Sequence, residues 1–123
     1  MKRDMELVRK LLLHIEEQFI YEPLDSTDIV IQGYSMEQIG YHFRIMEQGG
    51  LINAIDAGAS GDESCYYLID GITWWGHELL DTIRNDNVWN HTKEILKPLG
   101  SVSLDILKSV ATLFISSQLN IPK

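Results

Sequence analysis

The sequence has little cysteine, little basic charge in its first half and no long apolar runs, and each of these absences excludes some functions. Cys65 is the only cysteine, so an intrachain disulfide and a zinc-ribbon spacing are both excluded. Its neighbours in "SCYYLID" indicate a small apolar residue on a strand rather than a reactive thiol. No segment approaches the roughly 18 apolar residues of a membrane span. The opening "MKRDMELVRKLLLHIEEQ" carries charges where a signal peptide would be apolar, so we expect a cytoplasmic protein.

Length and composition limit the number of domains and the class of protein. A chain of 123 residues predicts one domain, and 45% hydrophobic with 23% charged residues is typical of a soluble globular protein. The net charge of −8 is uneven, because residues 1–70 hold five basic and thirteen acidic side chains whereas residues 71–123 hold five of each. Arg44 is the only basic residue in 11–83. The excess negative charge therefore lies entirely in the first part.

Periodicity and capping residues predict an α+β chain. We expect a winged-helix-like part over residues 1–70 (helix, short strand, helix, two-stranded β-hairpin wing) and a three-helix C-terminal extension over 71–123. Asp4 and Thr73 are predicted helix caps, and Ser35 with Gln38 forms a predicted capping box. The expected helices cover 5–19, 36–49, 74–84, 88–97 and 104–118, and the expected strands cover 29–32, 51–55 and 64–70.

Three stretches resemble one family. They are "MKRDMELVRKLLLHIEE", "YSMEQIGYHFRIMEQGGLI" and "ITWWGHELLDTIRNDNVWNHTKEIL". The chain is similar to domain of unknown function 2513, which has a "KRDM" start and an "LTWxGHxFLDxIRxxxxW" signature. Ile72 stands where that signature has Leu, Trp75 fills a variable position, and Leu79 replaces a common aromatic residue. The resemblance implies a winged-helix-like fold and a link to phage or mobile-element genes, with no known activity, ligand or catalytic residue.

The second helix has a polar face that could read DNA. Met36, Ile39, Phe43 and Met46 form its expected buried stripe. The opposite face and its flanks hold six candidate binding residues, which are Glu37, Gln38, Tyr41, His42, Arg44 and Gln48. Arg, Gln and His hydrogen-bond base edges, but affinity for DNA comes largely from Lys and Arg on phosphates. One arginine is too few, and DNA binding therefore ranks second.

The acidic wing suggests a protein partner instead. Asp56, Asp62 and Glu63 lie in the expected wing tip without any positive charge. Such a surface suits a basic partner, so a regulatory or adaptor role by protein–protein interaction ranks first. A negative surface also serves solubility alone, which is the plainer interpretation.

The "TWWGHELLDTIR" segment offers a structural cluster rather than chemistry. Its expected members are Thr73, Trp74, Gly76, His77, Asp81, Arg84 and, beyond the segment, Trp89. We expect a His77–Asp81–Arg84 row on one helix face, Gly76 to admit another backbone, and both tryptophans to fill a joint. A hydrolase-type or metal-dependent enzyme using His77 and Asp81 ranks third, because no further ligand or nucleophile motif accompanies them. We expect no cofactor and no metal.

The last expected helix has two apolar stripes. Leu104, Leu107, Ala111 and Phe114 mark its packing face, and Ile106 and Val110 widen it. The wider stripe suggests a homodimer through this helix, or simply a broad packing face.

Overall fold

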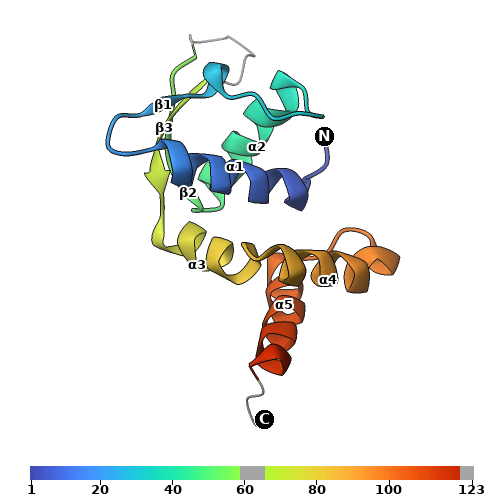
Figure 1. Ribbon diagram of the computed structural model, residues 1–123. Coiled ribbons are helices and arrows are strands. Elements are labelled where there is room, and N and C mark those ends of the chain that lie inside the picture. Colours follow the sequence, from blue (N-terminus) through green and yellow to red (C-terminus); the bar gives the residue numbers. More distant parts are fainter. Residues whose placement is uncertain (59–65, 120–123) are drawn as a thin grey trace. The chain divides into compact units, whose positions relative to one another are not determined.

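The computed structural model describes residues 1–58 and 66–119, and it comprises two units, Met1–His77 and Glu78–Lys123. The described residues form five α-helices, two short 3-10 helices (η) and one three-stranded antiparallel sheet (Figure 1). In chain order the elements are α1 (Met5–Gln18), β1 (Leu24–Asp25), η1 (Ser26–Asp28), α2 (Met36–Gln48), β2 (Ile52–Asp56), β3 (Tyr67–Ile72), α3 (Trp74–Ile83), α4 (Asp86–Leu96), η2 (Lys97–Leu99) and α5 (Leu104–Gln118). The predicted α+β class is confirmed.

The sheet of the N-terminal unit has the order β1-β3-β2. On β3, Leu68 lies opposite Asp25 on one side and opposite Ile55 on the other, so these three side chains form a row on one face. The register between β2 and β3 shifts near the end of β3, where Gly71 has a φ of 96°. An extra residue in a strand at such a glycine is a β-bulge, and it ends the regular pairing shortly before α3.

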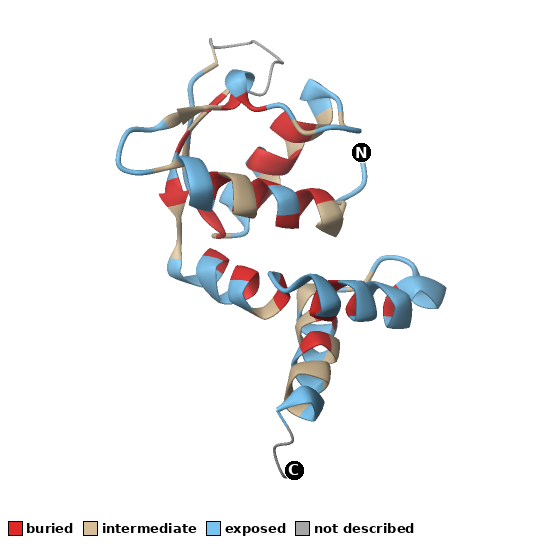
Figure 2. Ribbon diagram, in the orientation of Figure 1, coloured by how far each residue is buried: buried red, intermediate tan, exposed pale blue. Residues whose placement is uncertain are grey.

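The core of this unit lies between α1, α2 and the other face of the sheet (Figure 2). Its largest completely buried side chain is Phe43. The other buried apolar residues from these elements are Leu7, Val8, Leu11, Leu12, Ile15, Ile39, Met46, Ile52, Tyr67 and Ile69. Each fully buried side chain of this size stabilises the fold by about 1.5–3 kcal/mol relative to its exposed state.

The predicted helix starts are confirmed by hydrogen bonds. The Asp4 carboxylate accepts from the backbone N–H groups of Glu6 and Leu7, and so caps α1. At the start of α2, Ser35 and Gln38 form the reciprocal capping box. The predicted stripe on α2 is buried except for Met36, which is exposed in the first turn.

The strand predicted over residues 29–32 is wrong. The strand β1 lies five residues earlier, and it stops after Asp25 because that carboxylate accepts from the N–H and hydroxyl of Thr27, which starts η1. Ser26 is held by a bond from the Tyr67 N–H to its hydroxyl oxygen. The β-branched run after η1 contributes one buried anchor, Ile29, and no sheet pairing.

The hairpin is confirmed with shifted bounds. β2 starts one residue later than predicted, and β3 continues to Ile72 rather than ending at 70. Cys65 and the predicted loop residues from 59 onward lie outside the described residues.

The C-terminal unit contains the rest of α3 and the pair α4 and α5. Asn85 caps α4 and Ser103 caps α5, as the side-chain oxygens accept backbone N–H groups. The ring of His91 stacks on Phe114 with the ring centroids 4.1 Å apart. The start of α4 and the end of α5 also line one pocket, so the two helices run antiparallel. The buried residues Leu107 and Ala111 are on the side of α5 that packs on α4.

Candidate protein-binding surface

The six candidate residues on α2 differ in how far the structure exposes them. Glu37, Arg44 and Gln48 are exposed, and Tyr41 is half-buried. Gln38 is half-buried and uses its side-chain oxygen to accept the Ser35 N–H in the capping box.

The prediction that His42 belongs to the exposed face is wrong. Its side chain is only 1% exposed. The Nδ1–H donates to the carbonyl oxygen of Gln38 at 2.8 Å, and Nε2 accepts from the backbone N–H of Asp4 at 2.8 Å. The ring therefore joins α2 to the start of α1. A histidine in this role has both nitrogens engaged and none to offer a base edge.

The remaining exposed surface of α2 is acidic. Arg44 lies between Glu37 and Glu47, and all three are exposed, which gives this helix a net charge of −1. Of the other basic residues of the unit, Arg9 is buried, whereas Lys2, Arg3 and Lys10 are exposed. The Lys10 ammonium lies over the Tyr34 ring, 5.7 Å from its centroid. The α2 surface thus offers phosphates one positive charge beside two negative ones.

Asp4 connects the first residues of the chain to α2. Its carboxylate caps α1 through one oxygen and accepts the Tyr34 hydroxyl through the other at 3.0 Å, while its N–H binds His42. Burial, then the bond to Asp4, raises the pKa of Tyr34 to about 12. This part of the "KRDM" start has a structural role.

Of the predicted acidic wing tip, one residue is described. Asp56 is exposed at the end of β2 and accepts from the N–H of Gly58. Asp62 and Glu63 lie outside the described residues.

The structural cluster is partly confirmed at the start of α3. The Thr73 hydroxyl donates to the carbonyl oxygen of Gly50 and accepts from the N–H of Gly76 at 3.1 Å, so it caps the helix and ties it to β2. A Cβ at Gly76 would overlap the carbonyl oxygen of Leu51 and lie 2.6 Å from Cγ2 of Ile72. Gly76 therefore does admit another backbone.

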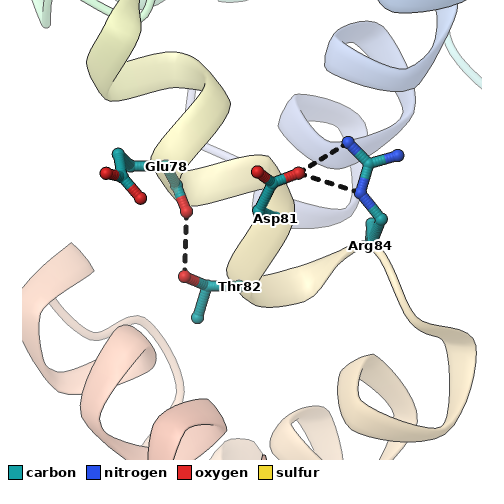
Figure 3. Close-up of polar contacts among 4 residues, drawn as sticks. All are labelled: Glu78, Asp81, Thr82 and Arg84. Atoms are coloured by element: carbon teal, nitrogen blue, oxygen red, sulfur yellow. Dashed lines mark hydrogen bonds and ion pairs between the residues drawn. The ribbon is translucent and has the colours of Figure 1, made fainter.

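The predicted polar row is shorter than expected (Figure 3). Asp81 accepts from Nη2 of Arg84 at 2.7 Å and from Nε at 3.0 Å. His77 is exposed, and in the described residues it has no hydrogen bond to Asp81. Surface pairs such as Asp81–Arg84 contribute roughly 1 kcal/mol or less.

Of the two tryptophans that were predicted to fill a joint, Trp89 is buried in α4 and Trp74 is exposed at the start of α3. Trp74 and Trp75 are 72% and 67% exposed. They begin α3 directly after Thr73, where the helix cap holds the backbone. Successive helical residues point about 100° apart, so two adjacent tryptophans cannot share one narrow buried stripe. The adjacency of Trp74 and Trp75 in the sequence therefore indicated that at least one of them would be exposed.

The sheet of the same unit has an outer face, which we define as Asp25, Asn53, Ile55, Tyr66 and Leu68. Asp25, Leu68 and Ile55 form the cross-strand row, and Ile55 is exposed. The Tyr66 hydroxyl donates to Asp25 at 3.1 Å, and Asn53 precedes Ile55 by two residues on the same side of β2. Asp70 is exposed on the same strand as Leu68, just before α3.

Hydrogen bonds hold Asp25 in its charged form. The bonds from the side chain and backbone of Thr27, and less so that from Tyr66, lower the pKa of Asp25. The same bond raises the pKa of Tyr66. A carboxylate thus fixed between an aromatic ring and aliphatic side chains is arranged to receive a cationic group.

The family comparison agrees with the motifs. The family described as "Hypothetical protein (DUF2513)" matches residues 2–103. This chain belongs to the DUF2513 family. An uncharacterised protein of Haemophilus influenzae is 40% identical over 120 residues, which cover 97% of this chain and 99% of that protein. No solved structure matches the chain.

Elsewhere in this DUF2513 chain, the C-terminal unit has an open pocket of about 510 Å³ between the start of α4 and the end of α5. Polar side chains on its rim already have partners: Asn85 caps α4, Thr82 donates to the Glu78 carbonyl, and Asp81 binds Arg84 (Figure 3). In the part of the chain that the structure describes, no three His, Cys, Asp or Glu side chains gather as a metal site would need. None of the described helices has the length and apolar character to cross a membrane.

Proposed function

We propose that this DUF2513 protein is a non-enzymatic regulatory or adaptor protein that binds a basic segment of another protein. The binding surface is the outer sheet face together with Trp74 and Trp75. The observation that carries the proposal is the exposed tryptophan pair at the start of α3, in the same unit as a sheet face that holds the fixed carboxylate of Asp25. Tryptophan is the residue type most enriched among the residues that dominate binding energy at protein interfaces.

The chemistry of this surface selects a cationic partner. Asp25 and Asp70 supply negative charge, and the indole rings offer faces on which Lys and Arg side chains stack. Ile55 and Leu68 add apolar area between the charges. The wider excess of acidic residues in 1–70 would attract such a partner from a distance and speed association.

The order of elements supports a winged-helix-like arrangement of the first unit. A helix, a short strand, a 3-10 turn, a second helix and a hairpin follow one another, and the first strand pairs beside the last. In that arrangement α2 would be the DNA-reading helix, and DNA binding is the alternative function. The acidic surface of α2 and the burial of His42 favour the protein partner. The implied link to phage or mobile elements suits a protein that masks a basic DNA-binding region.

The proposal is tested with a fluorescently labelled peptide rich in lysine and arginine, titrated with the full chain and followed by anisotropy. We expect binding at low ionic strength that weakens with added salt. The double variant W74A/W75A should lose about 2 kcal/mol of binding free energy, roughly a thirty-fold higher Kd. Tyr21→Ala is the matched control, because it removes another exposed aromatic side chain of the same unit.

Two further variants separate charge from tryptophan contact. Asp70→Lys should weaken binding and reduce its salt dependence, whereas Asp105→Lys in the C-terminal unit should change neither. No binding of the basic peptide at low ionic strength would refute the proposal. Equal affinities of W74A/W75A and Tyr21→Ala would remove the tryptophans from the binding surface.

A further inference from the structure

The C-terminal unit carries a second exposed apolar surface, which the proposed function does not use. On α5, Ile106 and Leu113 are 48% and 57% exposed, and Val110 lies between them, half-buried. We call these three residues the α5 stripe. Their steps of four and three place them on one side of the helix, next to the side that packs on α4. A stripe of large aliphatic side chains open to water marks an interaction site more often than a plain solvated face.

The partner helix extends the same surface. His91 on α4 stacks on Phe114, and the two helices are antiparallel. One turn farther from this contact, Ile95 on α4 comes level with Val110 on α5. Ile95 and, beyond it, Leu99 are both exposed. The α5 stripe therefore continues across the groove between the two helices.

The charge distribution of this unit favours a second copy of the chain as the partner on this surface. The only charged residues of α5 are Asp105 and Lys108, and their helical positions turn both away from the α5 stripe. Residues 71–123 as a whole carry five acidic and five basic side chains. In a two-fold symmetric dimer each patch meets its own copy, so a surface with a net charge would repel itself. The α5 stripe avoids that repulsion, whereas the acidic surface of residues 1–70 does not.

From these observations we infer that the α5 stripe is a homodimer interface, in which α5 packs antiparallel against α5 of a second copy. Val110 is near the middle of the stripe, so the two-fold axis passes close to it. The dimer presents two copies of the acidic surface, and its formation is independent of whether that surface binds a basic segment.

The test is sedimentation velocity of the full chain over a range of concentrations. We expect a dimer for the wild type and a monomer for the double variant Ile106→Glu/Leu113→Glu, with an unchanged far-ultraviolet circular dichroism spectrum. Ile55→Glu is the matched control, because it places the same change at an exposed isoleucine on β2 and should leave the dimer intact. A wild-type monomer at every concentration, or a dimer that survives the double variant, would overturn the inference.

Cross-linking provides a readout that does not depend on destabilising the interface. With Cys65→Ser as background, Val110→Cys should form a disulfide-linked dimer under mild oxidation. Thr112→Cys is exposed on the opposite side of α5 and should not. Equal cross-linking of the two variants would indicate random collision and refute the two-fold contact.

Discussion

At Gly76 the first turn of α3 lies directly against the backbone of the residue that precedes β2. The carbonyl oxygen of Leu51 accepts the Thr73 N–H and occupies the space that a side chain at Gly76 would need. Thr73 fixes the same junction through its hydroxyl, which binds both Gly50 and Gly76. The first turn of α3 is thus held against this backbone by one missing side chain and one hydroxyl group.

Replacing Gly76 by alanine should therefore be severe. We expect a loss of about 3 kcal/mol or more in the free energy of unfolding, because the new Cβ overlaps backbone atoms that cannot move independently. Gly50→Ala is the control: Gly50 has a φ of 75° but open space around it, so only the left-handed conformation costs energy, about 1 kcal/mol. Urea denaturation measures both. Equal losses for the two variants would contradict the close contact at Gly76.

Single-residue roles could be predicted where they depend on local chemistry. Asp4, Ser35 and Thr73 were each predicted from the preference of short polar side chains for helix caps, and each forms the cap. Burial was harder, because it depends on what the rest of the chain covers. A helical wheel does not show that His42 is enclosed by the start of α1 or that the side chain of Trp74 remains in water.

Among the elements, the helices and the hairpin could be predicted and the first strand could not. Helix periodicity extends over many residues, whereas β1 is two residues long and has no pattern of its own. Its position is decided by pairing with β3, more than forty residues away, and by the Asp25–Thr27 turn that ends it. The β-branched residues at 29–31 have strand propensity but no neighbouring strand to pair with. Tertiary context decides such short strands.

The link between α1 and the segment before α2 gives a prediction for alkaline pH. The pKa of Tyr34 is raised to about 12 by burial and by the bond to Asp4. A pKa that is higher in the folded state than the usual 10 stabilises the fold fully below pH 10, and this stabilisation is lost as the pH rises towards 12. The stability difference between wild type and Tyr34→Phe should therefore shrink over that range in urea denaturation.

Tyrosinate absorbance checks the same link directly. Tyr34→Phe should remove one ionisation near pH 12, and Asp4→Asn should move that ionisation to lower pH while burial keeps it above 10. An unchanged alkaline titration in Tyr34→Phe would refute the assignment.

For the whole molecule, the division of charge is the feature that the sequence reveals best. Residues 1–70 hold all of the net charge of −8, because thirteen acidic side chains outnumber five basic ones, of which Arg9 is buried. The helices could be predicted from periodicity, but the proposed binding surface could not. Its sheet part combines β1, β2 and β3, and only the strand register brings these strand residues to one face.

This charge argument predicts the outcome of a DNA-binding test. Labelled duplex DNA at low ionic strength, where attraction to phosphates is strongest, should show no anisotropy change with the wild type. The variant Glu37→Lys/Glu47→Lys reverses both acidic residues on α2 and leaves Arg44 between two lysines. If α2 is exposed to DNA as in a winged-helix protein, this variant should bind DNA with an affinity that falls as salt increases. In that case the negative charges of Glu37 and Glu47 are what prevents the wild type from binding.

The two proteins together separate shape from charge. Binding by the wild type would rank DNA above a basic protein partner and require a positive surface outside α2. Failure of the lysine variant, with an unchanged circular dichroism spectrum, would mean that α2 cannot approach a phosphate backbone at all. If the wild type does not bind DNA and the lysine variant does, the acidic side chains of α2 are what prevents DNA binding. The search for a partner would then turn to basic proteins.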